Sequence, residues 1–252
     1  MIKHFHKKYL AEQANIDAFI NNFSTSGKLL GNEKRNSIKL FELETHTVNI
    51  KSFKIPNIFN KIAYKFLRKS KAQRSFEYAK KLLDLDIGTP HPIAYYEFSN
   101  GLLFGKSYYI SEHIDYDLTY RELIRDLSYP DHENILRTFT KFTFKLHENN
   151  VFFLDHSPGN TLIKKEGNDY QFYLVDLNRM QFKALSFEER IKNFERLSKH
   201  ESMVKVMSEE YAKLIDKPYE KVFNLMWKLT QDYQEKFHRK RELKKRLKFK
   251  KQ

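Results

Sequence analysis

The amino-acid sequence predicts an α+β protein made of two lobes, with a strand-rich N-terminal half and a helix-rich C-terminal half. Segments that alternate apolar and polar residues, separated by polar turns, dominate roughly the first hundred residues. From Tyr120 onward, apolar residues recur instead at helical spacing. The two patterns meet at Ser111 to Tyr116, which we expect to join the lobes.

The N-terminal half is expected to form a sheet accompanied by two helices. Apolar residues at helical spacing among lysines and arginines predict a short basic amphipathic helix over Ile55–Lys69. A second helical pattern covers Lys71–Leu85 and ends near Gly88. The expected strands are Gly27–Leu30, Ser37–Leu43, Thr45–Phe53, Ile93–Phe98 and Leu102–Ser111.

The C-terminal half is expected to be mainly helical, with a few short strands. One apolar stripe, which includes Ile135 and Phe139, stops at Asn149-Asn150, a plausible helix end. Ser186 followed three residues later by Glu189 has the spacing of a capping box and predicts the start of another helix. Short strands are expected at Val151–Phe153, Thr161–Lys164 and Gln171–Asp176, the last two forming a hairpin.

Composition restricts the classes of protein that this sequence can encode. A chain of 252 residues with 40% apolar residues, including 22 Phe and 15 Tyr, is long enough to bury a sizeable core. It contains no cysteine, which excludes disulfides, thiolate metal sites and a cysteine nucleophile. No signal peptide or run of about 20 apolar residues is present. We therefore expect a soluble cytoplasmic protein.

The net charge of +14 is concentrated in two segments. Lys51–Lys81 and Lys236–Gln252 each contain ten Lys/Arg and one acidic residue, a net charge of +9, and the rest of the chain is net negative. Such segments favour anionic partners: a membrane surface, a nucleic acid or a phosphorylated ligand. For Ile55–Lys69 the alternatives are a membrane-surface helix and a helix packed on the first lobe. For the tail they are a membrane or glycolipid clamp, a solvated helix end and RNA binding.

The residues that point to a reaction lie between Val151 and Arg179. Asp155 follows a short strand, Asn160 comes five residues later, and Asp176 ends an apolar run. Phosphoryl transfer needs a residue that orients the attacking hydroxyl and hard oxygen ligands for magnesium, and these three side chains can supply both. Lys51, on an expected strand, can reach nucleotide phosphates, and Glu77 on the following helix is expected to hold its ammonium group.

These residues carry a resemblance to a known family. The sequences VNIK, the helix with Glu77, LDHSPGN and VDLN resemble the strand lysine, helix glutamate, catalytic loop and DFG elements of protein-kinase-like enzymes. The run from Ile55 to Leu83 and the ending VDLNR resemble in particular the bacterial lipopolysaccharide core kinases, the Kdo and heptose kinase group. Members of that group phosphorylate inner-core sugars with ATP, and on this resemblance we expect the protein to act at the cytoplasmic face of the inner membrane.

The resemblance implies a bilobal protein-kinase-like fold and a role for each site residue. The N-terminal lobe would span 1–112, the C-terminal lobe 113–235 and a basic tail 236–252. Asp155 would be the catalytic base, and Asn160 and Asp176 would hold magnesium. Lys51, positioned by Glu77, would bind the phosphates of ATP, and the backbone of Glu112 and Ile114 would meet the adenine.

Departures from the motifs bear on the substrate and on activity. Only nine residues separate Asp176 from Ser186, which leaves no room for the long segment on which protein substrates dock, so a small acceptor such as a sugar or lipid headgroup is favoured. The loop expected to cover the nucleotide phosphates contains only two glycines, Gly27 and Gly31. Asn178 replaces the DFG glycine, although Asn tolerates a left-handed backbone better than most residues. Phe153 and Leu154 replace the His and Arg of the catalytic loop.

Three function classes therefore remain. They are an ATP- and magnesium-dependent kinase for a core sugar or another small hydroxyl acceptor, a pseudokinase that binds a partner, and, least favoured, a nucleic-acid-binding protein. His156, next to the proposed base, is expected to be structural rather than catalytic. His4 and His6 are not expected to bind metal, and Phe139 and its neighbours are expected to be core. The oligomeric state is not predicted.

Overall fold

The computed structural model describes residues 1–31, 36–55, 68–100 and 103–249. The chain folds into two compact units: Met1–Asp115 with Leu174–Asn178, and Tyr116–Tyr173 with Arg179–Gln252. The predicted boundary between the lobes followed residue 112, and the predicted second lobe included the segment Leu174–Asn178 that here joins unit 1. The amphipathic helix predicted over Ile55–Lys69 lies almost entirely outside the described residues.

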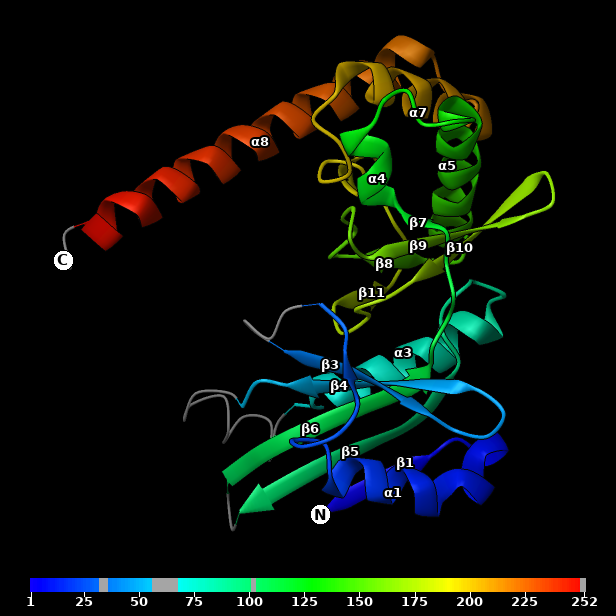
Figure 1. The fold of residues 1–252 in the computed structure, drawn as a ribbon. Helices are drawn as coiled ribbons and strands as arrows, with labels where there is room; N and C mark the ends of the chain where they lie inside the picture. The colour runs from blue at the N-terminus through cyan, green and yellow to red at the C-terminus, as the bar shows by residue number, and fades with distance from the viewer. Residues whose placement is uncertain (32–35, 56–67, 101–102, 250–252) are drawn as a thin grey trace. The chain divides into compact units, whose positions relative to one another are not determined.

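Unit 1 is built on one antiparallel six-stranded sheet of order β1-β5-β6-β4-β3-β2 (Figure 1). The five predicted strands are confirmed within a few residues. The sequence did not predict β1, because its four residues show too little alternation, nor the short helix η1 that follows it. The strands are β1 (Ile2–Phe5), β2 (Lys28–Leu29), β3 (Ser37–Glu42), β4 (Thr47–Phe53), β5 (Pro92–Asn100) and β6 (Leu103–Glu112), and η1 is Lys7–Glu12.

Two helices of unit 1 pack on opposite faces of this sheet. Helix α1 (Gln13–Asn21) buries Ile16 and Ile20 in the same core cluster as Tyr96 of β5. Helix α3 (Lys71–Asp84) packs Phe76 edge-on against Tyr95, the residue before Tyr96 on β5, at 5.5 Å between ring centroids. Successive side chains of a strand point to opposite faces, so α1 and α3 cover different sides. The predicted helix over 71–85 is confirmed.

Unit 2 is mainly helical, as predicted, and it contains two small sheets. The strands pair in the orders β10-β9-β7 and β11-β8. The helices and the three-stranded sheet surround a core that includes Phe139, which confirms that this residue is buried. The elements are β7 (Leu118–Thr119), α4 (Tyr120–Arg125), α5 (His132–Glu148), β8 (Val151–Phe153), β9 (Thr161–Glu166), β10 (Asp169–Leu174), β11 (Met180–Phe182), α6 (Phe187–Lys192), α7 (Glu201–Leu214) and α8 (Tyr219–Phe249).

The start of α6 is as the sequence predicts. The Ser186 hydroxyl accepts a hydrogen bond from the Glu189 amide, and the Glu189 carboxylate accepts one from the Ser186 amide, which together form the capping box. Helix α8 contains residues 236–249 of the predicted basic tail, and its second half projects beyond the other helices of unit 2 (Figure 1). None of the described helices is both long and apolar enough to cross a membrane.

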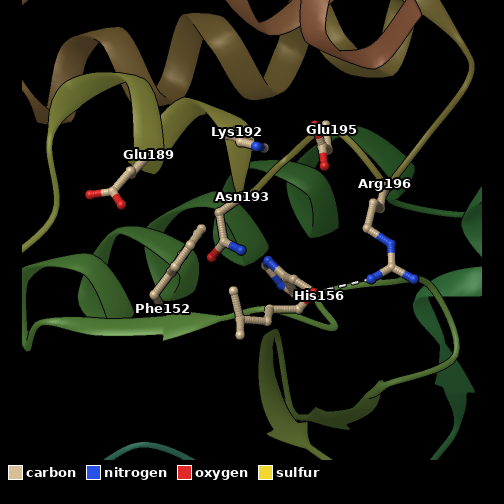
Figure 2. A pocket seen from close by; sticks show the side chains of 8 residues that line it. Phe152, His156, Glu189, Lys192, Asn193, Glu195 and Arg196 are labelled. Atoms are coloured by element: carbon tan, nitrogen blue, oxygen red, sulfur yellow. Dashed lines mark hydrogen bonds between the residues drawn. The ribbon is translucent and has the colours of Figure 1, made fainter. Parts of the chain in front are cut away.

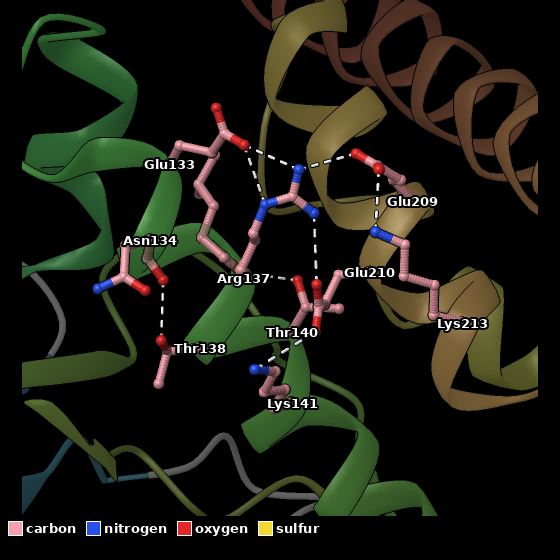
Figure 3. A network of polar contacts seen from close by, with 10 residues as sticks. Glu133, Asn134, Arg137, Thr138, Thr140, Lys141, Glu209, Glu210 and Lys213 are labelled. Carbon is pink, nitrogen blue, oxygen red and sulfur yellow. Dashed lines mark hydrogen bonds and ion pairs between the residues drawn. The ribbon is translucent and has the colours of Figure 1, made fainter.

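A network of charged side chains joins α5 to α7 (Figure 3). Arg137 of α5 lies 2.8 Å from carboxylate oxygens of Glu133 and Glu209, and 3.3 Å from one of Glu210. These contacts hold the pKa of Glu209 down at about 2. Lys213 also pairs with Glu209, at 3.0 Å. The network therefore links the two helices around a single guanidinium.

Candidate active site

The position of Lys51 follows from the alternation of β4. Val48 and Ile50 are fully buried in the core that α1 covers, so Lys51 points to the other face. Its cross-strand partner on β6 is Tyr109, which in turn pairs with Tyr95 of β5. These three residues share the sheet face on which α3 packs. The Lys51 side chain is only 12% exposed there.

Lys51 forms an ion pair with Asp176, at 2.7 Å between Nζ and Oδ1. Asp176 is held within unit 1 because the segment before it is anchored to the loop after α3: the Leu174 amide donates to the Gly88 carbonyl, and the Thr89 hydroxyl donates to the Leu174 carbonyl. Two residues predicted from separate motifs, the strand lysine and the aspartate after β10, are therefore in direct contact.

The segment around Asp176 contains one residue with a left-handed backbone conformation. Among the described residues, the left-handed conformation in this segment belongs to Asp176, with φ of 59°, and not to Asn178. Asn178 instead donates a side-chain hydrogen bond of 2.5 Å to Asp176 Oδ1. Aspartate tolerates this conformation better than most residues, and the two contacts to Oδ1 fix how its carboxylate is presented.

The expected contact between Glu77 and Lys51 is not formed in this structure: among the described ion pairs, Lys51 pairs with Asp176 and Glu77 with Lys69. Glu77 accepts from Lys69 at 2.7 Å and from Gln73 at 3.0 Å. Gln73 lies one turn before Glu77 on α3, so the carboxylate is held along its own helix. The sequence placed Glu77 on the correct helix but could not show which cation its carboxylate meets.

The segment proposed to meet adenine lies at the end of β6. The Glu112 amide donates to the His91 carbonyl, and Ile114 follows in a stretch without regular secondary structure. Burial opposes ionisation of the Glu112 side chain, but hydrogen bonds from Tyr9 and Lys8 outweigh it, and the pKa of Glu112 lies below its usual value. Its carboxylate thus ties β6 to η1, which the sequence did not indicate.

In unit 2, Asp155 and Asn160 lie on one loop after β8, as predicted. The Asn160 side-chain nitrogen donates to the Asp155 carbonyl at 2.8 Å, and the Asn160 backbone amide donates to the Ser157 carbonyl at 2.9 Å. Since its nitrogen is engaged, Asn160 retains its side-chain oxygen as an acceptor. The Asp155 side chain is 20% exposed.

His156 is buried, as expected for a structural histidine. It is 1% exposed and packs against the rings of Phe139 and Phe153. Burial lowers the pKa of His156 to about 3, so the ring is neutral at physiological pH. A cationic role for His156 in the reaction is therefore disfavoured.

Two residues that the sequence analysis missed hold this loop. Asn193 donates to the Phe153 carbonyl at 2.8 Å. Arg196, whose hydrogen bond is the dashed line in Figure 2, donates to the Leu154 carbonyl at 3.1 Å. Arg196 also lies 2.7 Å from Asp155 Oδ1. Both side chains line a cavity of about 160 Å³ beside β8, together with Phe152, Leu154, His156, Glu189, Lys192 and Glu195. No motif marks either residue in the sequence.

Asn193 is itself positioned by a buried chain of hydrogen bonds. His147 of α5 donates from Nε2 to the Asn193 side-chain oxygen at 3.1 Å and accepts from the Tyr211 hydroxyl of α7 at 2.7 Å. Burial lowers the pKa of His147 to about 4, so the neutral ring can serve as donor and acceptor at once. The loop geometry therefore depends on helices α5 and α7.

Together these features define a class of protein. A strand lysine paired with an aspartate, and a loop that carries an aspartate and an asparagine five residues apart, are components of a kinase-type phosphotransferase. Residues 40–219, well over half of the chain, match the family model described as Lipopolysaccharide kinase (Kdo/WaaP) family. The chain belongs to this family of phosphotransferases.

A solved structure described as WaaP in complex with acyl carrier protein has the same fold. The TM-score is 0.63 at 12% sequence identity, and the match covers 93% of this chain and 99% of that one. This similarity confirms the predicted bilobal protein-kinase-like fold. No curated protein matches the chain significantly in sequence.

Proposed function

We propose that this protein is an ATP-dependent kinase that transfers the γ-phosphoryl group to a sugar hydroxyl of the lipopolysaccharide inner core, either Kdo or heptose. Membership of the lipopolysaccharide kinase family supports this most directly. The paired Lys51 and Asp176, and the loop with Asp155 and Asn160, supply the chemical groups that the reaction needs.

Asp155 acts in this proposal as the catalytic base. One of its carboxylate oxygens is paired with Arg196, which leaves the other for the acceptor hydroxyl. A carboxylate that accepts the hydroxyl proton as the new P–O bond forms contributes about 10²–10⁴-fold to such a reaction. Its partial exposure is compatible with approach of an acceptor from solvent.

Lys51 binds the nucleotide phosphates in this proposal. Its ammonium is held by Asp176 in the present structure, and we propose that Glu77 holds it once the phosphates are bound, since α3 covers the sheet face that carries Lys51. The adenine would meet the backbone at Glu112 and Ile114. Because the Glu112 amide already donates to His91, its carbonyl is the group proposed for that contact.

Asn160 and Asp176 fit a magnesium ion by the chemistry of their free oxygens. Asn160 retains its side-chain oxygen, and Asp176 has one oxygen that neither Lys51 nor Asn178 uses. Hard oxygen donors of this kind suit magnesium, which binds proteins through one or two such groups plus phosphates. When bound, the ion would neutralise charge that develops on the phosphates.

The test is phosphoryl transfer from ATP, with magnesium, to a panel of acceptors. A Kdo-bearing lipid A precursor, a heptose-bearing core glycolipid and the delipidated form of each distinguish the sugar and the need for a lipid. We expect transfer to at least one acceptor and its loss in Asp155→Ala. No product from wild type with any acceptor, or undiminished product from the variant, would overturn the proposal.

A scaffold of the same fold is the second candidate, favoured by the contact of Lys51 with Asp176 rather than Glu77. Nucleotide binding separates the two, because a ligand at a hundred times its dissociation constant stabilises a protein by about 2.7 kcal/mol. A rise in melting temperature with ATP and magnesium that is lost in Lys51→Met supports the kinase. Absence of any rise supports the scaffold.

We also propose that the protein works at the cytoplasmic face of the inner membrane, with α8 contacting anionic lipid. The exposed second half of this helix carries Phe237, Leu243 and Leu247, 48%, 54% and 62% exposed, among many basic residues. Apolar side chains in the interface and cations at phosphates are what such contact requires. Vesicles containing anionic lipid should bind the protein at low salt and release it at high salt; equal binding to neutral vesicles would contradict this.

A further inference from the structure

The loop that carries Asp155 and Asn160 is held by side chains from a segment about forty residues further along the chain. Asn193 and Arg196 are three residues apart and hold the successive carbonyls of Phe153 and Leu154, immediately before Asp155. The same Arg196 nitrogen, Nη1, then pairs with Asp155 Oδ1. One segment therefore sets both the path of the loop and the orientation of its carboxylate.

Arg196 is itself held by a contact with helix α8. Its guanidinium lies over the ring of Tyr233 on α8, 5.6 Å from the ring centroid. Burial disfavours its charge, but hydrogen bonds to Tyr233 and Asp155 outweigh this, and the pKa of Arg196 is raised. The side chain is 28% exposed, so most of it is packed. These contacts restrict the guanidinium to the geometry in which it meets Asp155.

The charge on Arg196 compensates for a feature of the sequence. Phe153 and Leu154 stand where kinase loops carry His and Arg, and neither can orient the neighbouring carboxylate. A guanidinium is always protonated, so it can bind one oxygen of Asp155 without competing for the proton that the other oxygen receives. Nη1 carries two hydrogens, so this one nitrogen can donate to the Leu154 carbonyl and to the Asp155 carboxylate together.

We propose that Arg196 is a positioning residue for phosphoryl transfer, which holds one oxygen of Asp155 and thereby directs the other to the acceptor hydroxyl. This inference rests on the proposed function, because it assigns Asp155 the role of base. Asn193 supports the same geometry by fixing the carbonyl of Phe153, two residues before Asp155.

The test compares three variants by kcat and KM for ATP. Arg196→Met removes the charge at similar length, Arg196→Lys retains the charge without the fork, and Arg137→Met is a matched control because Arg137 is a similarly exposed arginine of unit 2 bound to carboxylates elsewhere. We expect Arg196→Met to lower kcat about 10- to 100-fold with an unchanged KM for ATP. Arg196→Lys should be intermediate, and Arg137→Met should stay within twofold of wild type.

A second measurement separates this inference from the proposed function. The amides of His156 and Asn160 are hydrogen-bonded within the loop, and their hydrogen exchange reports its order whether or not an acceptor is phosphorylated. Exchange over 154–160 should be faster in Arg196→Met than in wild type and Arg137→Met. Unchanged exchange, or a kcat equal to that of Arg137→Met, would overturn the positioning role, whereas absence of transfer in wild type bears on the proposed function alone.

Discussion

Two arginines of unit 2 with similar exposure, Arg137 and Arg196, are used in different ways. Arg137, 25% exposed, contacts three glutamates on the helices α5 and α7. Arg196, 28% exposed, contacts one carboxylate and one carbonyl on a loop, and an aromatic ring on α8. The same guanidinium chemistry holds regular helices together in one place and orients a single side chain in the other.

Because the two arginines are similarly exposed, it is the residues they bind, rather than their burial, that indicate which ion pair contributes to the reaction. The glutamates around Arg137 lie on helices that other contacts also order. Asp155 lies on a loop without regular structure, so the orientation of its carboxylate depends on a few side chains. We therefore expect changes near Arg196 to affect the rate of reaction, and changes near Arg137 to affect stability.

The largest effect of this set is expected from Asn160→Ala, which lies on the loop held by Arg196. It removes the hydrogen bond to the Asp155 carbonyl and the oxygen proposed to hold magnesium. We expect kcat to fall about 10²–10³-fold, as for the loss of one group that stabilises transition-state charge, while stability falls by only about 1 kcal/mol. Steady-state kinetics and urea unfolding measure the two. A rate within fivefold of wild type would contradict the role of this loop.

The next largest effect is expected at His147 of α5. Its ring is hydrogen-bonded to Tyr211 of α7 and to Asn193, which holds the loop of Asp155. The pKa of His147 is lowered to about 4 in the folded protein, so on acidification the unfolded chain takes up a proton first. The stability that the neutral His147 contributes above pH 6.5 is then lost as the pH falls. Between pH 7 and pH 5 the free energy of unfolding should decrease by roughly 2 kcal/mol because of this residue. Unfolding free energies of wild type and His147→Gln should converge over this interval.

The control for this titration is His238→Gln, because His238 is exposed on α8. That variant should follow wild type at each pH. Equal slopes for wild type and His147→Gln would show that His147 does not contribute to acid destabilisation. His156, whose pKa is also lowered, leaves a remaining slope in both proteins.

Arg137→Met is expected to have a smaller effect, on stability alone. It leaves Glu210, whose side chain is 12% exposed, without its closest cation. We expect a loss of about 1–2 kcal/mol, equivalent to a few degrees in melting temperature, and kcat within twofold of wild type. A large fall in kcat at unchanged stability would reverse the comparison between the two arginines.

Lys213→Met should have the smallest effect. Lys213 is 62% exposed and pairs with Glu209 one turn before it on α7. Exposed pairs at this spacing contribute about 0.3–0.5 kcal/mol, and salt screens them. Urea unfolding at low and high ionic strength should show a small difference that disappears with salt; a loss above about 1 kcal/mol would indicate that the Arg137 network acts as a unit.

The sequence predicted the parts of this protein whose signals are local. The alternation of β4 placed Lys51 on a strand, and the spacing of Ser186 and Glu189 marked the start of α6. The fold class and the shared loop of Asp155 and Asn160 followed from similar patterns and from the family resemblance.

The particular partner of each side chain was not predictable in this way. Glu77 pairs with Lys69 because of side-chain geometry that no spacing encodes. The left-handed residue in this segment is Asp176, and the side-chain amide of Asn178 binds its carboxylate. Arg196 reaches Asp155 from about forty residues further along the sequence, and nothing near it resembles a motif.

The most direct test of the account is the rate of phosphoryl transfer by Asp155→Asn at saturating ATP, measured with an acceptor that wild type uses. Asparagine keeps the shape of the side chain but cannot take the hydroxyl proton. We predict a rate about 10²–10⁴-fold below that of wild type, with an unchanged rise in melting temperature on adding ATP and magnesium. A rate near that of wild type would contradict the assignment of Asp155 as the base.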